Sequence, residues 1–341
     1  MAQKEKNIHP SQVPFMVYAD EKGNLFEDTK FEAVGRSAHT IQRLQASDFV
    51  LLPEGSSLFH LPLRKATGFN IQKKEISNRP KGLACAAFVA PAYSQTHMAA
   101  WETLPDAPIL PLYAYSVLGW LDDQFYTTAF RVDPDIRQDC DQFDQRIVEK
   151  NANKLVKEYP DNRLIHHLYH CACVYLCPAA RNFFLKRWEA PLPTSPSCNS
   201  NCKGCISWQP KSSGITSPQN RIAFAPTAEE IAEVALMHIA VAPNPVVSFG
   251  QGCEGEPLLV WETLRDAIKL IRKKTKKGTI NLNTNGSMPA AVQAMIDVGL
   301  DSIRISLNSA QKELYNSYYR PKKYSFEDII KSAQVAKRNK K

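Results

Sequence analysis

The chain has 341 residues and a mass of 38.3 kDa, a length that favours two domains or one large α/β barrel. Hydrophobic residues make up 44% and charged residues 22%, a globular balance that excludes global disorder. The net charge of +8 is concentrated near the end, where residues 320–341 hold eight basic residues against Glu327 and Asp328. We interpret this stretch as a solvated helix end; the alternative is a patch for nucleic acid or an acidic partner.

No membrane segment is predicted. The longest apolar stretch, residues 107–121, has 15 residues interrupted by Pro and Gly, whereas a spanning helix needs ~20. The N-terminus lacks the apolar core of a secretory signal, so we expect a cytoplasmic protein without membrane contact. In a reducing compartment, closely spaced cysteines bind metal or do chemistry more often than they pair.

The first part of the chain is predicted to be rich in strands. Short apolar runs at 49–52, 86–90 and 125–132, separated by turns with Pro, Gly and Asp, predict a β-rich accessory domain over residues 1–160. A helix at 142–158 joins it to an apolar helical run at 164–188, so residues 161–187 are predicted to be a connecting helical segment. No catalytic motif is found in this part, and a substrate-handling role is expected only by analogy.

A first group of cysteines lies inside that apolar run. Cys171, Cys173 and Cys177 are flanked there by histidines. Free cysteine packs as a small hydrophobic residue, so a buried helix is the favoured interpretation. The alternative is that these thiols bind a second cluster.

A second group, Cys198, Cys202 and Cys205, has the spacing C-x3-C-x2-C, which is much rarer by chance than three cysteines in any short window. It follows a Pro-rich stretch and lies among Asn, Ser, Lys and Gly, as a loop would. Such a loop lets three thiolates converge on one centre. Structural zinc needs a fourth ligand, and no matching pair follows downstream, whereas a four-iron cluster held by three cysteines keeps one iron open.

Helices and strands alternate after this loop. A capping box at Thr227–Glu230 begins a helix, and strands are predicted at 246–249, 279–283 and 302–307. Helices are predicted between them, around 264–271 and 289–298, and a last helix begins at Ser325. With a strand before Cys198, residues 188–341 contain about four βα units of a parallel sheet.

The cysteine motif resembles the signature of the radical S-adenosylmethionine (radical SAM) superfamily. The resemblance implies a [4Fe–4S] cluster on Cys198, Cys202 and Cys205, with S-adenosylmethionine (SAM) chelated to its open iron. It also implies reductive cleavage of SAM to a 5′-deoxyadenosyl radical that abstracts hydrogen from a substrate, and an electron donor such as flavodoxin or ferredoxin. Gly204 stands where the family usually has an aromatic residue, so we expect the cluster to be less covered on that side.

The same resemblance implies which residues bind SAM. Residues 255–257 look like the family's Gly-Glu-Pro motif, in which Glu256 would accept from the methionine amino group. Polar residues after the next strands would hold the ribose, and Arg320 would pair with the methionine carboxylate. The expected SAM-binding residues are Gly255, Glu256, Asn283, Asn285, Ser306, Asn308 and Arg320. Cys253 is given no role, and no side chain is identified as catalytic.

The expected fold class is therefore α/β: a partial (β/α) radical SAM barrel in residues 188–341 after a β-rich or α+β N-terminal domain. Four units are fewer than the family barrel has, so we expect a chain truncated at its C-terminus, with strand 302–307 at an open edge and poor solubility. A peptide or protein side chain is the predicted substrate, because the N-terminal domain is large and the barrel mouth would be open. The alternatives are an RNA-modifying radical SAM enzyme and a non-catalytic metal-binding protein.

Overall fold

The computed structural model describes residues 9–341 and divides the chain into two compact units, residues 1–142 and 143–341. Three helices that follow the division belong to the second unit: α1 (Gln145–Glu158), α2 (Arg163–Cys173) and α3 (Pro178–Phe184). The division thus differs from the expected boundary at residue 160 and the separate connecting segment at 161–187. The physical reason is that the apolar faces of these helices, with Val148 and Leu168, are buried in the core of the second unit.

The first unit is built on antiparallel strands, as predicted. Strand β1 (Phe15–Ala19) pairs with both β2 (Leu25–Ser37) and β6 (Glu75–Phe88), and β5 (Ser57–Asn70) also pairs with both of those strands. These pairings close a small four-stranded barrel. Its interior is filled by apolar side chains that include Met16, Phe31 and Leu61.

The remaining elements of the first unit are short. They are β3 (Thr40–Arg43), η1 (Ala46–Asp48), β4 (Val50–Leu51), β7 (Tyr93–Gln95), β8 (Met98–Ala99), β9 (Trp101–Thr103), β10 (Leu118–Leu121), β11 (Gln124–Thr127), β12 (Ala129–Arg131), η2 (Ile136–Gln138) and η3 (Cys140–Gln142). Strands β7 and β12 form a separate pair, and the other strands among these extend the sheet of the barrel. The prediction of a β-rich N-terminal part is confirmed.

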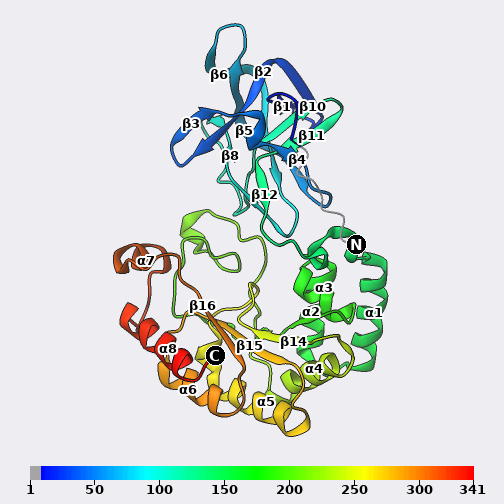
Figure 1. The fold of residues 1–341 in the computed structure, drawn as a ribbon, viewed down its shortest axis with the longest axis vertical. Coiled ribbons are helices and arrows are strands. Elements are labelled where there is room, and N and C mark those ends of the chain that lie inside the picture. The colour runs from blue at the N-terminus through cyan, green and yellow to red at the C-terminus, as the bar shows by residue number, and fades with distance from the viewer. Residues whose placement is uncertain (1–8) are drawn as a thin grey trace. The chain divides into compact units, whose positions relative to one another are not determined.

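The second unit contains a parallel sheet of four strands in the order β13 (Glu189–Pro191), β14 (Val246–Phe249), β15 (Thr279–Thr284) and β16 (Ser302–Ile305). Helices α4 (Ala228–Val241), α5 (Trp261–Lys274), α6 (Pro289–Asp297) and α8 (Phe326–Arg338) lie along one side of it (Figure 1). Helix α7 (Lys312–Tyr319) and two short 3₁₀ turns, η4 (Lys211–Ser213) and η5 (Pro257–Val260), complete the unit. This is the predicted partial barrel with four βα units.

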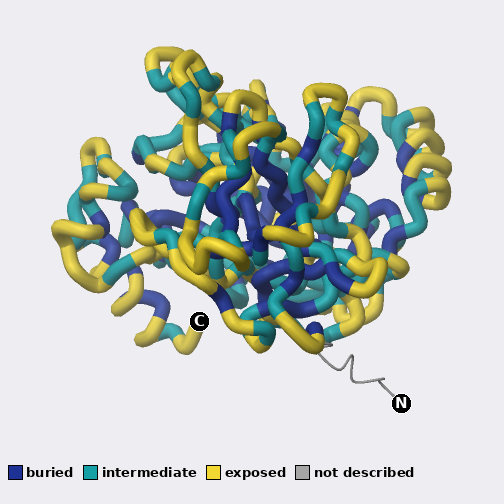
Figure 2. Tube along the Cα trace, turned by 90° about the horizontal axis from the view of Figure 1, so that it is seen from above, coloured by how far each residue is buried: buried dark blue, intermediate teal, exposed yellow. Residues whose placement is uncertain are grey.

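The two faces of this sheet differ in polarity. Side chains such as Val247, Phe249, Ile280 and Leu282 are buried against the helices. The opposite face carries polar side chains, so that Asn281 Nδ2 donates to Ser248 Oγ over 3.3 Å. Figure 2 shows the buried stretches of the trace enclosed by exposed loops and helix faces.

Local signals in the sequence explain several of these elements. The side chain of Thr227 accepts from the N–H of Glu230, whose carboxylate accepts from the N–H of Thr227, which is the expected capping box of α4. Ser325 and Asp328 form the corresponding box of α8. Gly299, with φ +112°, ends the helix α6 as expected.

Strand β16 is an edge strand. Within residues 9–341 it pairs with β15 alone, which confirms the expected edge. It is shorter than the predicted 302–307, although the N–H of Ser306 continues the pairing with the carbonyl of Thr284 at 2.8 Å. In the same part of the chain, no helix is both long and apolar enough to cross a lipid bilayer.

Candidate cofactor site

The three cysteines of the C-x3-C-x2-C motif lie in a loop that follows the C-terminal end of β13. All three thiols are free and partly buried. Burial, together with the neighbouring thiols of Cys198 and Cys205, raises the pKa of Cys202 to about 12. Three thiolates this close together repel one another. A positively charged centre is therefore needed to keep all three deprotonated.

The surroundings of Cys205 favour its thiolate. Burial alone would raise its pKa, but hydrogen bonds from Ser207 and the charge of the Arg221 guanidinium outweigh burial, and the pKa is lowered. Arg221 Nη2 lies 3.5 Å from Cys205 Sγ, and Ser207 Oγ lies 3.6 Å from it. Arg221 was not identified from the sequence, because a lone arginine in a loop carries no signal that separates it from other surface arginines.

The donor set fits a [4Fe–4S] cluster with one open iron. The loop supplies three soft thiolate ligands, which is the set that such a cluster accepts from a protein while keeping one iron for another ligand. The side chains around Cys202 include four partly or fully buried tyrosines, whose pKa values burial raises, with a further rise from the charge of Cys202. A half-buried, aromatic surrounding of this kind limits the access of water to the thiols.

The aromatic side chain beside the third cysteine comes from helix α7 and not from position 204 of the motif. A Cβ atom on Gly204 would lie 2.7 Å from the hydroxyl of Tyr318, so only glycine lets this α7 side chain approach so closely. The expectation of less cover on that side is therefore wrong. Tyr318 was not found from the sequence, because it lies more than a hundred residues beyond the motif.

A buried carboxylate joins the cysteine-bearing segment to the loop after β14. Glu254 Oε2 accepts from the N–H groups of Thr194 and Ser195 at 2.7 and 3.0 Å and from Thr194 Oγ1 at 3.0 Å. Its Oε1 accepts from the N–H groups of Gly250 and Gln251, both at 2.7 Å. Burial raises the pKa of Glu254. Five donors on one carboxylate fix the two chain segments against each other.

The Gly-Glu-Pro motif packs directly on the cysteine loop. The N–H groups of Gly255 and Glu256 donate to the carbonyls of Ser195 and Ser197 at 2.7 and 2.8 Å. A Cβ atom on Gly255 would lie 1.9 Å from the carbonyl oxygen of Ser197, a distance no side chain tolerates. The motif requires glycine at this position because the two backbones touch.

The carboxylate of Glu256 is engaged by the protein itself. It is 4% exposed and accepts from the N–H of Leu258 at 3.0 Å, from the N–H of Asn285 at 2.8 Å and from the hydroxyl of Thr284. Burial raises its pKa to about 7. Glu256 thereby ties the loop after β14 to the C-terminal end of β15.

Asn285 continues this network to the cysteine loop. Its Nδ2 donates to Asn199 Oδ1 at 2.7 Å and to Ser200 Oγ at 3.2 Å, both between the first and second cysteine. Asn283 lies elsewhere, on the polar face of the sheet, where its Nδ2 donates to the carbonyl of Phe249 at 3.2 Å. The two asparagines predicted together thus have different surroundings.

The last three predicted residues lie near the same edge. Ser306 and Asn308 are the first and third residues after β16, and the C-terminal ends of parallel strands share one edge of a sheet. Arg320 ends α7 in a left-handed conformation and is exposed. The neighbouring carbonyl of Tyr319 accepts from the N–H of Asn201 at 3.0 Å, so this segment runs beside the cysteine loop.

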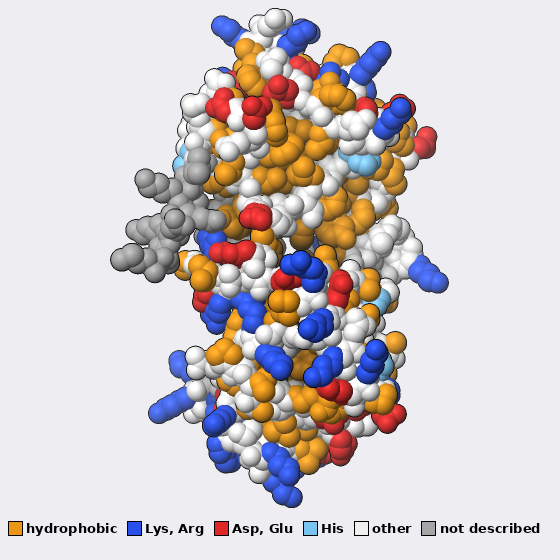
Figure 3. All heavy atoms as spheres, turned by 90° about the vertical axis from the view of Figure 1, so that its right-hand side faces the viewer, with side chains coloured by type: hydrophobic (Ala, Val, Ile, Leu, Met, Phe, Trp, Pro, Cys, Tyr) orange, Lys and Arg blue, Asp and Glu red, His pale blue; other side chains and the backbone are white. Residues whose placement is uncertain are grey.

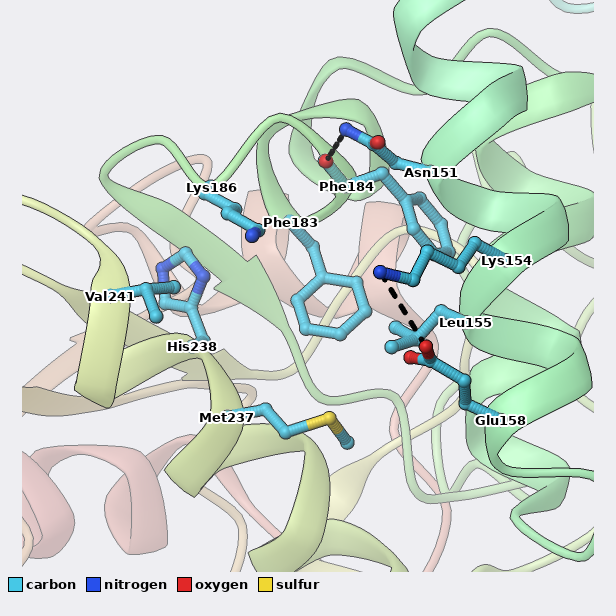
Figure 4. A pocket seen from close by; sticks show the side chains of 10 residues that line it. All are labelled: Asn151, Lys154, Leu155, Glu158, Phe183, Phe184, Lys186, Met237, His238 and Val241. Carbon is cyan, nitrogen blue, oxygen red and sulfur yellow. Dashed lines mark hydrogen bonds and ion pairs between the residues drawn. The ribbon is translucent and has the colours of Figure 1, made fainter.

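A cavity of about 230 Å³ lies among α1, α3 and α4 (Figure 4). His238 and Val241 from the end of α4 line it together with Phe183, and Lys154 pairs there with Glu158. The end of α4 precedes β14, so this cavity lies toward the N-terminal ends of the strands. Binding sites in parallel α/β sheets form at the carboxyl ends, which separates this cavity from the cysteine loop.

Comparisons with known proteins bear on the same segment. Residues 192–341 match the family model of the Radical SAM superfamily. Over 130 residues the chain is 28% identical to the FeMo cofactor biosynthesis protein NifB of Klebsiella pneumoniae, a match that covers 38% of this chain and 27% of that protein. The chain therefore spans about a quarter of the length of this curated relative.

Two solved structures of the FeFe-hydrogenase maturase HydG are also similar. The structure from Carboxydothermus hydrogenoformans shares 12% identity, covers 56% of this chain and 51% of its own, and has a TM-score of 0.33. The other shares 15% identity, covers 60% of this chain and 49% of its own, and has a TM-score of 0.34. The match to the Radical SAM family model therefore covers the segment, residues 192–341, that bears the three cysteines and the Gly-Glu-Pro motif, and this family implies a [4Fe–4S] cluster and SAM as cofactors.

Proposed function

We propose that this enzyme cleaves SAM reductively and abstracts a hydrogen atom from a side chain of a peptide or protein. The bound cluster and SAM would supply one electron and, from it, a 5′-deoxyadenosyl radical. The observation that carries the proposal is the packing of Gly255 and Glu256 on the cysteine loop. This packing brings the predicted cluster ligands and the predicted SAM motif to one strand edge.

The proposed roles depend on whether each side chain is free to bind a ligand or is already hydrogen-bonded within the protein. Cys198, Cys202 and Cys205 would ligate the cluster. Arg320 is exposed beside the loop and is proposed to pair with the methionine carboxylate of SAM. Glu256 gives its carboxylate to protein donors, so we propose that its main role is to hold the loop in shape, with the backbone around Gly255 facing the methionine.

Ser306, Asn308, Asn283 and Asn285 are proposed to line the rest of the SAM site. Asn308 is exposed, and Ser306 follows the end of β16, which suits contacts to ribose hydroxyls. Asn283 faces the polar side of the sheet, where a ligand would lie against β15. Asn285 holds the cysteine loop through Asn199 and is proposed to set the position of the cluster.

The charges of the second unit bear on the choice between a peptide and RNA as substrate. Within the basic stretch 320–341, Lys331 lies 3.5 Å from Asp328, whereas Glu327 pairs with Lys312 of α7 at 2.6 Å. On the face drawn in Figure 3, basic side chains stand among acidic and apolar ones. RNA binding is dominated by contacts from unpaired basic groups to phosphates, so this stretch keeps RNA as the alternative, while the large first unit supports a peptide as the substrate we propose.

The electron for this reaction is proposed to come from a flavodoxin or ferredoxin. The basic residues of 320–341 that are not paired offer a surface for such an acidic protein.

The proposal is tested by anaerobic reconstitution of the chain with iron and sulfide, followed by an assay for reductive cleavage of SAM. Cys198→Ala should abolish both the cluster absorption and the formation of 5′-deoxyadenosine. Cys173→Ala, a thiol of α2 outside the loop, is the matched control and should keep both. A variant lacking all three loop cysteines that still holds a full cluster would overturn the assignment. Retention of the cluster without SAM cleavage would favour a non-catalytic metal-binding protein.

A further inference from the structure

A second group of metal-ligand side chains lies outside the cysteine loop. The imidazole of His167 and the thiols of Cys171 and Cys253 place their donor atoms within 4.8 Å of one another. His167 and Cys171 are one turn apart on the same face of α2. Cys253 comes from the loop after β14 and is 86 residues from His167 in the sequence.

The distances within this group match those around a single tetrahedral ion. His167 Nε2 lies 3.4 Å from Cys253 Sγ and 3.5 Å from Cys171 Sγ. A zinc ion binds sulfur at about 2.3 Å and imidazole nitrogen at about 2.0–2.1 Å, so tetrahedral angles set sulfur and nitrogen roughly 3.5 Å apart. The third pair, the thiols of Cys171 and Cys253, also lies within 4.8 Å, so the three donors surround one position.

The group is also buried and held in place. Cys171 is 1% exposed and Cys253 6%, His167 is half-buried, and the His167 and Phe224 rings meet edge to face at a centroid distance of 6.4 Å. The carbonyl of Cys253 accepts from the N–H of Ile222 at 2.8 Å, and Asn162 caps α2 at its start. Buried thiolates are costly unless a cation neutralises them, and a preformed donor set lowers the ordering cost of binding one.

We propose that His167, Cys171 and Cys253 bind one divalent zinc ion that fastens α2 to the loop after β14. Unlike structural zinc sites with four protein ligands, this site has three protein donors and leaves the fourth position of the tetrahedral ion to a water molecule. Cys253 directly precedes Glu254, Gly255 and Glu256, the residues that hold the cysteine loop. The ion thus stabilises the base on which the cluster loop rests and does not itself enter the reaction. Zinc binding here does not require SAM cleavage.

The test is metal analysis of the full chain after reconstitution with iron and sulfide and incubation with Zn²⁺. We expect about one zinc ion per chain in addition to the iron of the cluster. Cys253→Ser and His167→Gln should lose zinc, whereas Cys202→Ser should lose iron and keep zinc. Cys173→Ser and His170→Gln, neighbours on α2 outside the donor group, are the matched controls and should keep both metals.

Cobalt substitution gives an independent readout. Co²⁺ added to the Cys202→Ser variant should produce a thiolate-to-cobalt charge-transfer band, which the additional change Cys253→Ser removes. Circular dichroism confirms that each variant is folded. Absence of zinc and of the cobalt band in folded protein would overturn the proposal. A disulfide between Cys171 and Cys253 in anaerobically purified protein would also overturn it. The same holds if the group binds iron in place of zinc, as shown by iron that is lost in the Cys253→Ser variant.

Discussion

At the scale of single residues, the contact between Gly255 and the cysteine loop leaves no room for a larger side chain. Gly255→Ala would force its Cβ atom against the Ser197 carbonyl oxygen at 1.9 Å, so the two loops must separate. We expect a loss of about 1–3 kcal/mol in the free energy of unfolding, the usual cost of overpacking, together with a lower iron content after reconstitution. Urea denaturation and iron analysis measure the two effects.

Gly252→Ala is the control in the same loop. Its Cβ atom would first meet the ends of the Ile206 and Gln219 side chains, which can move aside. An equal loss of stability and iron in both variants would contradict the role assigned to Gly255.

The second prediction at this scale concerns pH. Burial raises the pKa of Glu256 from 4.5 to about 7, so the folded protein holds this proton more tightly than the unfolded chain does. Protonation of Glu256 therefore contributes on the order of 3 kcal/mol to the free energy of unfolding. This contribution is complete below about pH 4.5 and is lost as the pH rises through 7. Glu256→Gln mimics the protonated form and should remove this slope. Urea denaturation of both proteins between pH 5 and 8 measures it, and a wild-type protein that gains stability relative to the variant as pH rises would refute the prediction.

At the scale of elements, α7 shields the cluster loop. Tyr318 reaches Gly204 from this helix, and the carbonyl of Tyr318 accepts from the N–H of Lys203 at 3.0 Å. Tyr318→Ala should open the cluster to water and oxygen, so that iron is lost several-fold faster in air, as followed by absorbance. Tyr318→Phe keeps the ring and should lose iron at the wild-type rate. Leu314→Ala, on the exposed side of α7, should also leave the rate unchanged. Equal rates in Tyr318→Ala and wild-type protein would remove the shielding role.

The elements differ in how far the sequence predicts them. Capping boxes and apolar periodicity predict α4 and α8, and short apolar runs predict β14 and β15, because these signals are local. Helix α7 was missed because Gln311 at its start makes no side-chain cap and only Tyr315 is buried. The cysteine motif was found by spacing, but Glu254, Arg221 and Cys253 act through contacts with distant segments. No local pattern reveals such contacts.

At the scale of the whole molecule, the open edge of the parallel sheet governs solubility. Strand β16 has no partner on its outer side within residues 9–341, and Leu307 just after it is exposed. Unpaired edges with apolar neighbours favour association between chains, so we expect this chain to aggregate as its concentration rises. Leu307→Lys should keep it monomeric at several-fold higher concentration, as measured by size-exclusion chromatography.

Leu314→Lys adds the same charge on α7, away from the edge, and should not have this effect. If both lysine variants improved solubility equally, net charge rather than the edge would be the cause.

The carboxylate of Glu254 has a consequence for the order of assembly. Its five donors are protein groups from two segments, residues 194–195 and 250–251, which are about 55 residues apart in the sequence. An anion with this many backbone partners forms its contacts together or not at all, so the segment after β13 and the loop after β14 become ordered in one cooperative step of folding. We therefore expect the frame that receives the cofactors to form during folding, before they are bound. Binding of the cluster and SAM then has to order only the cysteine side chains and their short loop. Most of the conformational entropy of the site is lost earlier, during folding.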